Sequence, residues 1–175
     1  MEYRRKKEKR TNYRKRLRLL KSRKPRLVIR RTLRNILAQL IIYESNSDKT
    51  IVSAHSKELI KLGYKAPKRN LPTAYLVGAL LAKKAREKSI IHVIPDIGFY
   101  PATRGSMIFS VLKGAKDGGL DFSLNESVVP NEDRIEGKHI VHYATQKKEH
   151  FLHYGINPLE IPFMFAEVKR KLIGK

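Results

Sequence analysis

The sequence contains no cysteine and is poor in acids, with 16 Asp and Glu against 38 Lys and Arg among 175 residues. Without cysteine the chain has no disulfide, no thiolate zinc ligand and no cysteine nucleophile. It also lacks an apolar run of the roughly 18–20 residues needed to cross a bilayer. No hydrophobic stretch follows the basic N-terminus, so we expect no secretory signal and a soluble, intracellular protein. Hydrophobic residues make up 41% of the chain, enough for one domain with a core.

Positive charge is concentrated near the N-terminus. Residues 4–34 hold 17 of the 38 cations, and with only Glu2 and Glu8 as acids, residues 1–34 carry +15 of the formal +22. Such a segment repels itself and needs an anionic partner. Tyr13, Leu17 and other flat or apolar residues between the cations suit RNA, which offers bases for stacking. If about ten cations neutralise phosphates, log affinity should fall with log salt at a slope of roughly −7 to −9.

Three strands are expected after this basic segment. Arg26–Arg31 alternates in polarity, Ile36–Glu44 is rich in β-branched and aromatic residues, and turn-forming residues precede Thr50–Ala54. Short turns between them predict an antiparallel meander. The remaining expected elements, in chain order, are a short helix over Ser56–Leu62, a helix from Asn70 to about Lys88 with one apolar face, a buried strand over Ile90–Ile94, a helix from Ser106 to Asp117, a helix over Asn131–His142 and a terminal helix after Pro162.

This order of elements predicts an α/β fold. The strand over Ile90–Ile94 should join the meander as a parallel neighbour, giving a mixed sheet with helices packed on it. We divide the chain into a basic arm at 1–23, an α/β core at 24–121 and a helical C-terminal extension at 122–175. Thr11 or Asn12 can cap a short helix over Tyr13–Leu20 in the arm, although we expect the arm to be disordered before a partner binds.

Asp96 is the main candidate for catalysis, because it follows the predicted buried strand. A metal-dependent nuclease would need several carboxylates there, and the core offers Glu44, Asp48 and Asp117. We favour a structural role in which Asp96 accepts a hydrogen bond from the backbone of the next loop. The nuclease, with RNA as its substrate, is kept as the alternative function, and a sequence-tolerant DNA-compacting protein as a third.

The histidines and glycines give weaker signals. Two pairs at i, i+3, His139 with His142 and His150 with His153, favour surface or phosphate-contacting roles over a metal site. The glycines at 98 and 105 have the wrong spacing for a phosphate-binding loop, but Arg104 precedes a helix start and can meet a backbone phosphate. We expect no cofactor and no metal.

Several motifs resemble one known family. They are the run Thr11–Val28, Ala38–Leu40, Ser53–Ser56, Pro72–Gly78, Asp96–Gly98, Gly105–Ser106, Gly114–Leu120 and Asn131–Ile140. Together they are similar to the archaeal-type branch of the eighteenth large-subunit ribosomal protein family, which holds 5S ribosomal RNA in the central protuberance. The resemblance covers nearly the whole chain and is loose beyond Val141.

The resemblance implies a structural, non-catalytic protein of the cytoplasmic ribosome. Its expected partners are 5S rRNA, large-subunit rRNA and neighbouring ribosomal proteins, with no membrane and no small-molecule substrate. Carried onto this sequence, it implies the following RNA-binding residues: Tyr13, Arg14, Arg16, Lys21, Ser22, Lys24, Arg26, Arg30, Arg31, Gln39, His55, Ser56 and Arg104.

Overall fold

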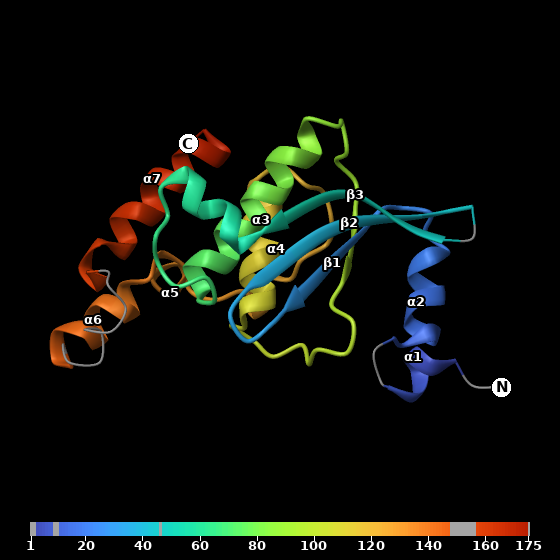
Figure 1. The fold of residues 1–175 in the computed structure, drawn as a ribbon, viewed down its shortest axis with the longest axis horizontal. Coiled ribbons are helices and arrows are strands. Elements are labelled where there is room, and N and C mark those ends of the chain that lie inside the picture. The colour runs from blue at the N-terminus through green and yellow to red at the C-terminus, as the bar shows by residue number, and fades with distance from the viewer. Residues whose placement is uncertain (1–2, 9–10, 46, 148–156, 175) are drawn as a thin grey trace.

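The computed structural model describes residues 3–8, 11–45, 47–147 and 157–174 (Figure 1). Its elements, in chain order, are α1 (Arg4–Lys7), α2 (Tyr13–Leu20), β1 (Arg26–Arg31), β2 (Ile36–Glu44), β3 (Ser47–His55), the 3-10 helix η1 (Ser56–Leu62), α3 (Leu71–Arg86), β4 (Ile94–Asp96), α4 (Met107–Asp117), η2 (Glu126–Val128), α5 (Glu132–Glu136), α6 (Lys138–Gln146), η4 (Pro158–Glu160) and α7 (Ile161–Ile173). No helix in these segments is long and apolar enough to cross a membrane.

The four strands form one mixed sheet in the order β3-β2-β1-β4. β1, β2 and β3 make the antiparallel meander, with Ala38 of β2 opposite both Ile29 and Ala54. β4 runs parallel to β1, with Ile94 opposite Arg26. A parallel pair needs a crossover, and the segment that contains α3 provides it. The predicted mixed sheet with packed helices is therefore confirmed.

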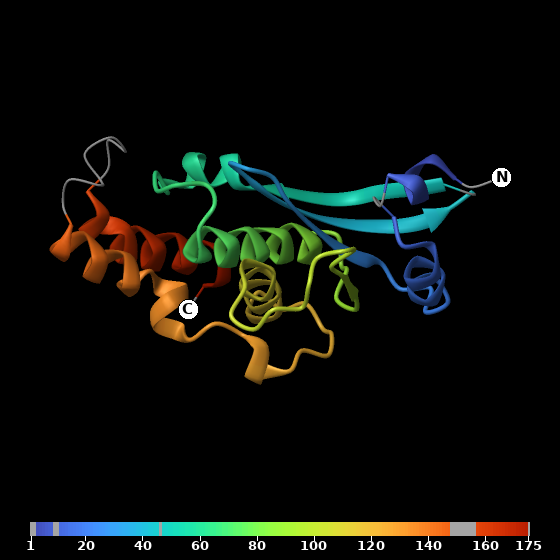
Figure 2. The ribbon, with the colours of Figure 1, turned by 90° about the horizontal axis from the view of Figure 1, so that it is seen from below.

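α3 is the central helix of the molecule. It packs against β2 and β3, and it also contacts α4 and α7. Figure 2 shows the sheet, α3 and α4 as successive layers. Thirteen of the sixteen residues of α3 are buried, from Leu71 to Ala85. The apolar face expected for this helix is therefore only part of the buried surface, since partners enclose the helix on nearly all sides.

The axes of α3 and α4 come together at two glycines. A Cβ on Gly78 would lie 2.0 Å from the carbonyl oxygen of Val111, and a Cβ on Gly114 would lie 2.0 Å from the carbonyl oxygen of Tyr75. No side chain fits at such a distance, so the two backbones are in direct contact. The hydroxyl of Ser110 adds a hydrogen bond across the crossing, donated to the carbonyl oxygen of Leu71 at 2.8 Å.

The C-terminal helices share the core of the sheet and α3. Ile135 of α5 and Phe165 of α7 belong to the same buried cluster, and the Phe165 ring lies 5.4 Å from that of Tyr75. Burial and a 2.8 Å hydrogen bond to Asp117 raise the pKa of Tyr75 above its ordinary value. The boundary expected between the α/β core and the C-terminal extension, after residue 121, stays a prediction. The second histidine pair, at 150 and 153, lies outside the described residues.

The expected strand over Ile90–Ile94 is wrong in position, because β4 begins at Ile94. Ahead of β4, the N–H of Asp121 donates to the carbonyl oxygen of Ile91 at 2.9 Å, and the N–H of Val93 donates to that of Asp121 at 3.1 Å. The first half of the apolar run therefore pairs with the segment after α4. Val93 is buried, but Ile91 is 50% exposed.

Other boundaries differ because of individual residues. The helix expected over Asn131–His142 is divided into α5 and α6 at Gly137, whose φ of +88° ends the first helix. A Cβ on Gly137 would lie 3.1 Å from Pro72, which also favours glycine there. β3 begins at Ser47, where a turn was expected, and residues 56–62 form a 3-10 rather than an α-helix.

Two lysines near the C-terminal end of α3 hold it to β3 through hydrogen bonds. Lys84 Nζ and Lys88 Nζ each donate to a β3 carbonyl oxygen at 2.8 Å, on Ser53 and Ile51 respectively. Lys84 also pairs with Glu58 of η1. Partial burial raises the pKa of Glu58, but the Lys84 hydrogen bond and the His55 N–H outweigh it and hold that pKa below its ordinary value.

Gly114→Ala should lower the free energy of unfolding by about 1–3 kcal/mol, because the new methyl forces α3 and α4 apart and this cost exceeds alanine's better helix propensity. Urea denaturation followed by circular dichroism measures the change. Lys116→Ala, in the same helix but away from the crossing, is the control and should stay within about 0.5 kcal/mol of the wild type. Equal stabilities for the two variants would contradict the close crossing.

Candidate nucleic-acid interface

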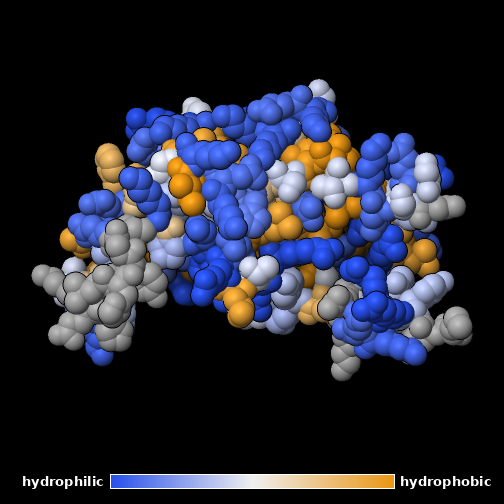
Figure 3. All heavy atoms as spheres, viewed as in Figure 1, coloured by the Kyte–Doolittle hydropathy of each residue, from blue (hydrophilic) through white to orange (hydrophobic). Residues whose placement is uncertain are grey.

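The basic arm lies beside the sheet and borders a cavity of about 930 Å³, which we call the arm cavity. Figure 1 places α1 and α2 next to the far end of the β2–β3 hairpin. The lining includes Tyr13, Lys15 and Arg16 of the arm, Arg26, Arg30 and Gln39 of the sheet, and the loop from Ile97 to Tyr100. Figure 3 shows apolar side chains over the strands beside the hydrophilic side chains of the arm.

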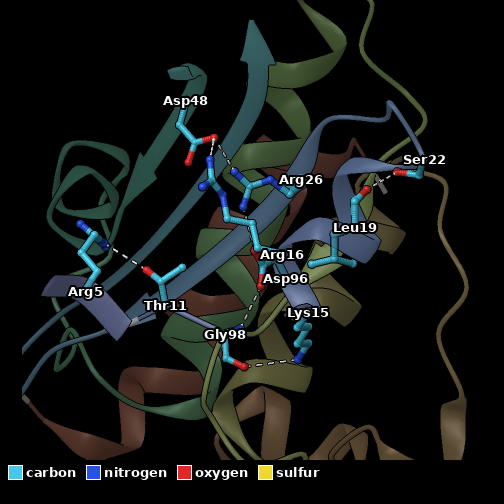
Figure 4. Close-up of polar contacts among 10 residues, drawn as sticks. All are labelled: Arg5, Thr11, Lys15, Arg16, Leu19, Ser22, Arg26, Asp48, Asp96 and Gly98. Carbon is cyan, nitrogen blue, oxygen red and sulfur yellow. Dashed lines mark hydrogen bonds and ion pairs between the residues drawn. The ribbon is translucent and has the colours of Figure 1, made fainter. Parts of the chain in front are cut away.

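A buried guanidinium holds the walls of the arm cavity together. Arg26 of β1 has a side chain only 5% exposed, and it donates to Asp96 Oδ2 at 2.9 Å and to Asp48 Oδ1 at 2.8 Å. Arg16 of α2 donates to the same Asp48 oxygen at 2.9 Å. Asp96 Oδ1 accepts from the N–H of Gly98 at 3.0 Å. Figure 4 shows how these bonds join the arm, β1, the hairpin and the loop after β4.

Charge complementarity keeps Asp48 ionised. Partial burial raises the pKa of Asp48, but hydrogen bonds and positive charges from Arg16 and Arg26 outweigh it and lower that pKa below its ordinary value. The carboxylate therefore stays negative at neutral pH and links two cations that would otherwise repel each other.

α2 forms as predicted. It is held to the body by a few polar contacts, which differs from the disorder expected of the arm before a partner binds. The side chain of Asn12 caps it by accepting from the N–H of Lys15 at 3.1 Å. Lys15 Nζ donates to the carbonyl oxygen of Gly98 at 3.3 Å, and the Arg16 guanidinium lies 5.6 Å from the ring of Tyr43. The Ser22 hydroxyl donates to the Leu19 carbonyl oxygen at 2.7 Å and so closes the helix end (Figure 4).

Most other cations of the arm and of the segment that follows it have no protein partner. In the described structure, the exposed cations whose side chains make no hydrogen bond, ion pair or ring contact include Arg14, Arg18, Lys21, Arg23, Lys24 and Arg30. Arg14, Arg18 and Lys21 are spaced i, i+4 and i+7 and so lie on one side of the helix and its end. The arm thus presents a row of unneutralised charge to solvent.

A protein-family model described as "Ribosomal large subunit proteins 60S L5, and 50S L18" matches residues 1–93, more than half of the chain. The chain belongs to this family. It is accordingly a structural protein of the large ribosomal subunit with ribosomal RNA and proteins as partners. The match spans the arm, the first three strands and α3, which include the arm and strand sides of the arm cavity.

The hydrogen bonds of Asp96 are consistent with the structural role of this family. One carboxylate oxygen accepts from the Gly98 N–H, as the expected structural role predicted, and the other pairs with Arg26, which was not predicted. Within the described ranges no three His, Asp or Glu side chains gather in an arrangement that could hold a metal ion. Nothing in this geometry favours the nuclease alternative.

The structure brings most of the expected RNA-binding residues to the arm cavity or the arm beside it. Tyr13, Arg16, Arg26, Arg30, Arg31 and Gln39 line the cavity, while Arg14, Lys21, Ser22 and Lys24 lie in or just after α2. Arg26 is largely enclosed by its two carboxylates, which makes it a residue that positions the others.

The last three expected residues lie elsewhere. His55 is the last residue of β3 and Ser56 the first of η1, at the end of the strand opposite Asp48. His55 Nδ1 accepts from the Lys57 N–H at 3.0 Å and caps η1, and the buried Ser56 hydroxyl accepts from the N–H of Ile36 at 3.2 Å. Arg104 is exposed in the loop before α4, outside the arm cavity.

Sequence reasoning did not single out Phe99 and Tyr100, which lie beside the expected RNA-binding residues. Both line the arm cavity, and the Arg31 guanidinium lies 4.9 Å from the Tyr100 ring. Tyr100 also exchanges hydrogen bonds of 3.2 Å with the backbone of Arg31. Two adjacent aromatic residues in a loop of a basic protein were the available signal.

Asp48→Asn should lower the free energy of unfolding by about 1 kcal/mol at neutral pH, because the amide no longer carries the charge that pairs with Arg16 and Arg26. The folded-state pKa of Asp48 is lowered from 3.8, so this stabilisation is present above about pH 4 and is lost as pH falls through the folded pKa. Urea unfolding over a pH series measures it.

Glu44→Gln is the control for this experiment, because the Glu44–Lys49 pair is exposed and contributes little. A wild-type advantage over Asp48→Asn that persists undiminished at about pH 2 would contradict the assigned role of Asp48.

Proposed function

We propose that this protein binds 5S ribosomal RNA through its arm and the adjoining sheet, and attaches that RNA to large-subunit rRNA in the central protuberance. The observation that carries the proposal is the row of unpartnered cations on α2 and β1 beside a cavity with aromatic walls. The resemblance of the motifs from Thr11 onward supports 5S rRNA in particular, since charge alone does not select among RNAs.

The cations of the arm and of the segment that follows it, up to Arg30, divide into two groups. Arg4 and Arg5 bond to Glu8 and Thr11 within the arm. Lys15 and Arg16 bond to Gly98 and Asp48 and so hold the arm against the body. The six unpartnered cations named above remain for phosphates. If each meets one phosphate, they contribute roughly −4 to −5 to the slope of log affinity against log salt.

Selectivity for folded RNA must come from shape and from contacts to bases. Duplex DNA and duplex RNA both supply phosphates, but unstacked bases occur mainly in the loops and bulges of RNA. The aromatic residues Tyr13, Phe99 and Tyr100 around the arm cavity suit such bases. The surfaces of the C-terminal helices lie away from the arm and remain free for contacts with neighbouring ribosomal proteins (Figure 1).

The triple substitution Arg14→Ala, Arg18→Ala and Lys21→Ala should weaken 5S RNA binding and reduce the magnitude of the salt slope by about 2–3, because three phosphate contacts are lost. Filter binding or fluorescence anisotropy across salt concentrations measures both quantities. Lys57→Ala, Lys61→Ala and Lys65→Ala together remove the same charge from exposed sites outside the arm and should leave the slope nearly unchanged.

Competition between RNAs tests the identity of the partner. The wild-type protein should prefer 5S RNA to transfer RNA and to duplex DNA at physiological salt, and RNA that co-purifies with it at moderate salt should be enriched in 5S sequences. Equal affinity for all three nucleic acids would refute the proposed function, whatever the salt dependence.

A further inference from the structure

The arm cavity has the size of a ligand site, and its lining combines apolar and positively charged residues. Its volume of about 930 Å³ falls within the roughly 300–1,000 Å³ typical of small-molecule pockets. Val28 and Ile41 contribute apolar surface from neighbouring strands, and cations surround them. An inorganic phosphate cannot pack against apolar surface. A nucleotide has a flat base that can contact the apolar residues and an anionic group that can pair with the cations.

We propose that the arm cavity receives a single unstacked nucleotide of the bound RNA, with its base against Phe99 and its base edge read by Gln39. This inference rests on the proposed RNA-binding function and adds to it a specific site with a specific kind of occupant.

Phe99 provides an aromatic ring in the cavity lining that is accessible to a base. It is 52% exposed and lines the cavity, and no ring or cation contact to it occurs among the described residues. The other aromatic rings of the lining are engaged, since Tyr13 lies 5.2 Å from Tyr3 and Tyr100 is covered by Arg31. A base that enters can therefore stack on Phe99 without displacing a protein group.

Gln39 supplies the reading group. It lies in the middle of β2, half-buried, opposite Val28 on one side and Ser53 on the other. Its side-chain amide has no hydrogen-bond partner within the described chain, although it has both donors and an acceptor. A glutamine amide can form two hydrogen bonds with the edge of one base, and this bidentate contact discriminates between bases.

The charges around the cavity favour an anionic occupant. Six cations line it, namely Arg5, Lys15, Arg16, Arg26, Arg30 and Arg31, against the carboxylates of Asp48 and Asp96. The Nε atoms of Arg16 and Arg26 are buried without a hydrogen-bond partner, so the network is short of acceptors. Arg30, which is exposed and unpartnered, is placed to meet the phosphate of the nucleotide.

Two uncharged substitutions in the full-length protein test the site. Phe99→Ala and Gln39→Leu should each weaken 5S RNA binding by roughly 5–100-fold, the loss expected for one stacked or one base-edge contact. Neither removes a charge, so the salt slope should stay that of the wild type. Leu33→Ala is the control, because Leu33 is an apolar residue 87% exposed at the β1–β2 turn, and it should bind as the wild type does.

Base-specific chemical probing of the RNA provides a second readout. One nucleotide should be protected by the wild-type protein and become reactive with Gln39→Leu, while the protection of the backbone by the arm remains. Thermal unfolding should show that all three variants are folded. Wild-type affinity for both Phe99→Ala and Gln39→Leu would overturn the nucleotide site and leave 5S RNA binding intact.

Nucleoside monophosphates separate this inference from the proposed function. Titrated into the wild-type protein, they should shift the NMR signals of the Gln39 side-chain amide more than inorganic phosphate does. If that shift occurs while 5S RNA is not preferred to transfer RNA, the nucleotide site stands and the 5S function falls. Equal shifts with inorganic phosphate and nucleotides would overturn the site, since only an anion would then be recognised.

Discussion

The interface depends on one buried cation. Arg26 reaches two carboxylates from separate parts of the chain, Asp48 on the hairpin and Asp96 at the end of β4. The Arg26 guanidinium would be costly to bury alone, so the two carboxylates stabilise it in this position. Because Asp48 also pairs with Arg16, the orientation of the arm is coupled to the register of the sheet.

The positive charge of the N-terminal segment therefore serves two purposes. One group of cations is used inside the protein, where carboxylates and backbone carbonyls hold the arm against the body. The other group, exemplified by Arg14 and Arg18 on the outer side of α2, has no partner in the described structure. An arm that is already positioned loses less conformational entropy when RNA binds than a free tail of the same charge would lose.

Local sequence patterns predicted the local structure well. The meander, a helix cap at Thr11 or Asn12 and the bond from the loop backbone to Asp96 all follow from short-range chemistry, and the structure shows Asn12 as the cap. Contacts between distant segments were not visible in these patterns. The pairing of Ile91 with Asp121 moved β4, and the two carboxylates that enclose Arg26 come from residues 22 and 70 positions away. The ring of Phe99 became an interface candidate only when the fold placed its loop beside the arm.

The lysines that fasten α3 to β3 have a consequence for assembly. β3 is an edge strand, and an open edge invites a strand from another molecule to add to the sheet. Lys84 and Lys88 occupy two of its outward carbonyl oxygens, on Ser53 and Ile51. At the other edge, β4 has only three residues and contains Pro95. Both edges therefore make it harder for the sheet of one copy of this chain to extend into that of another before RNA is bound.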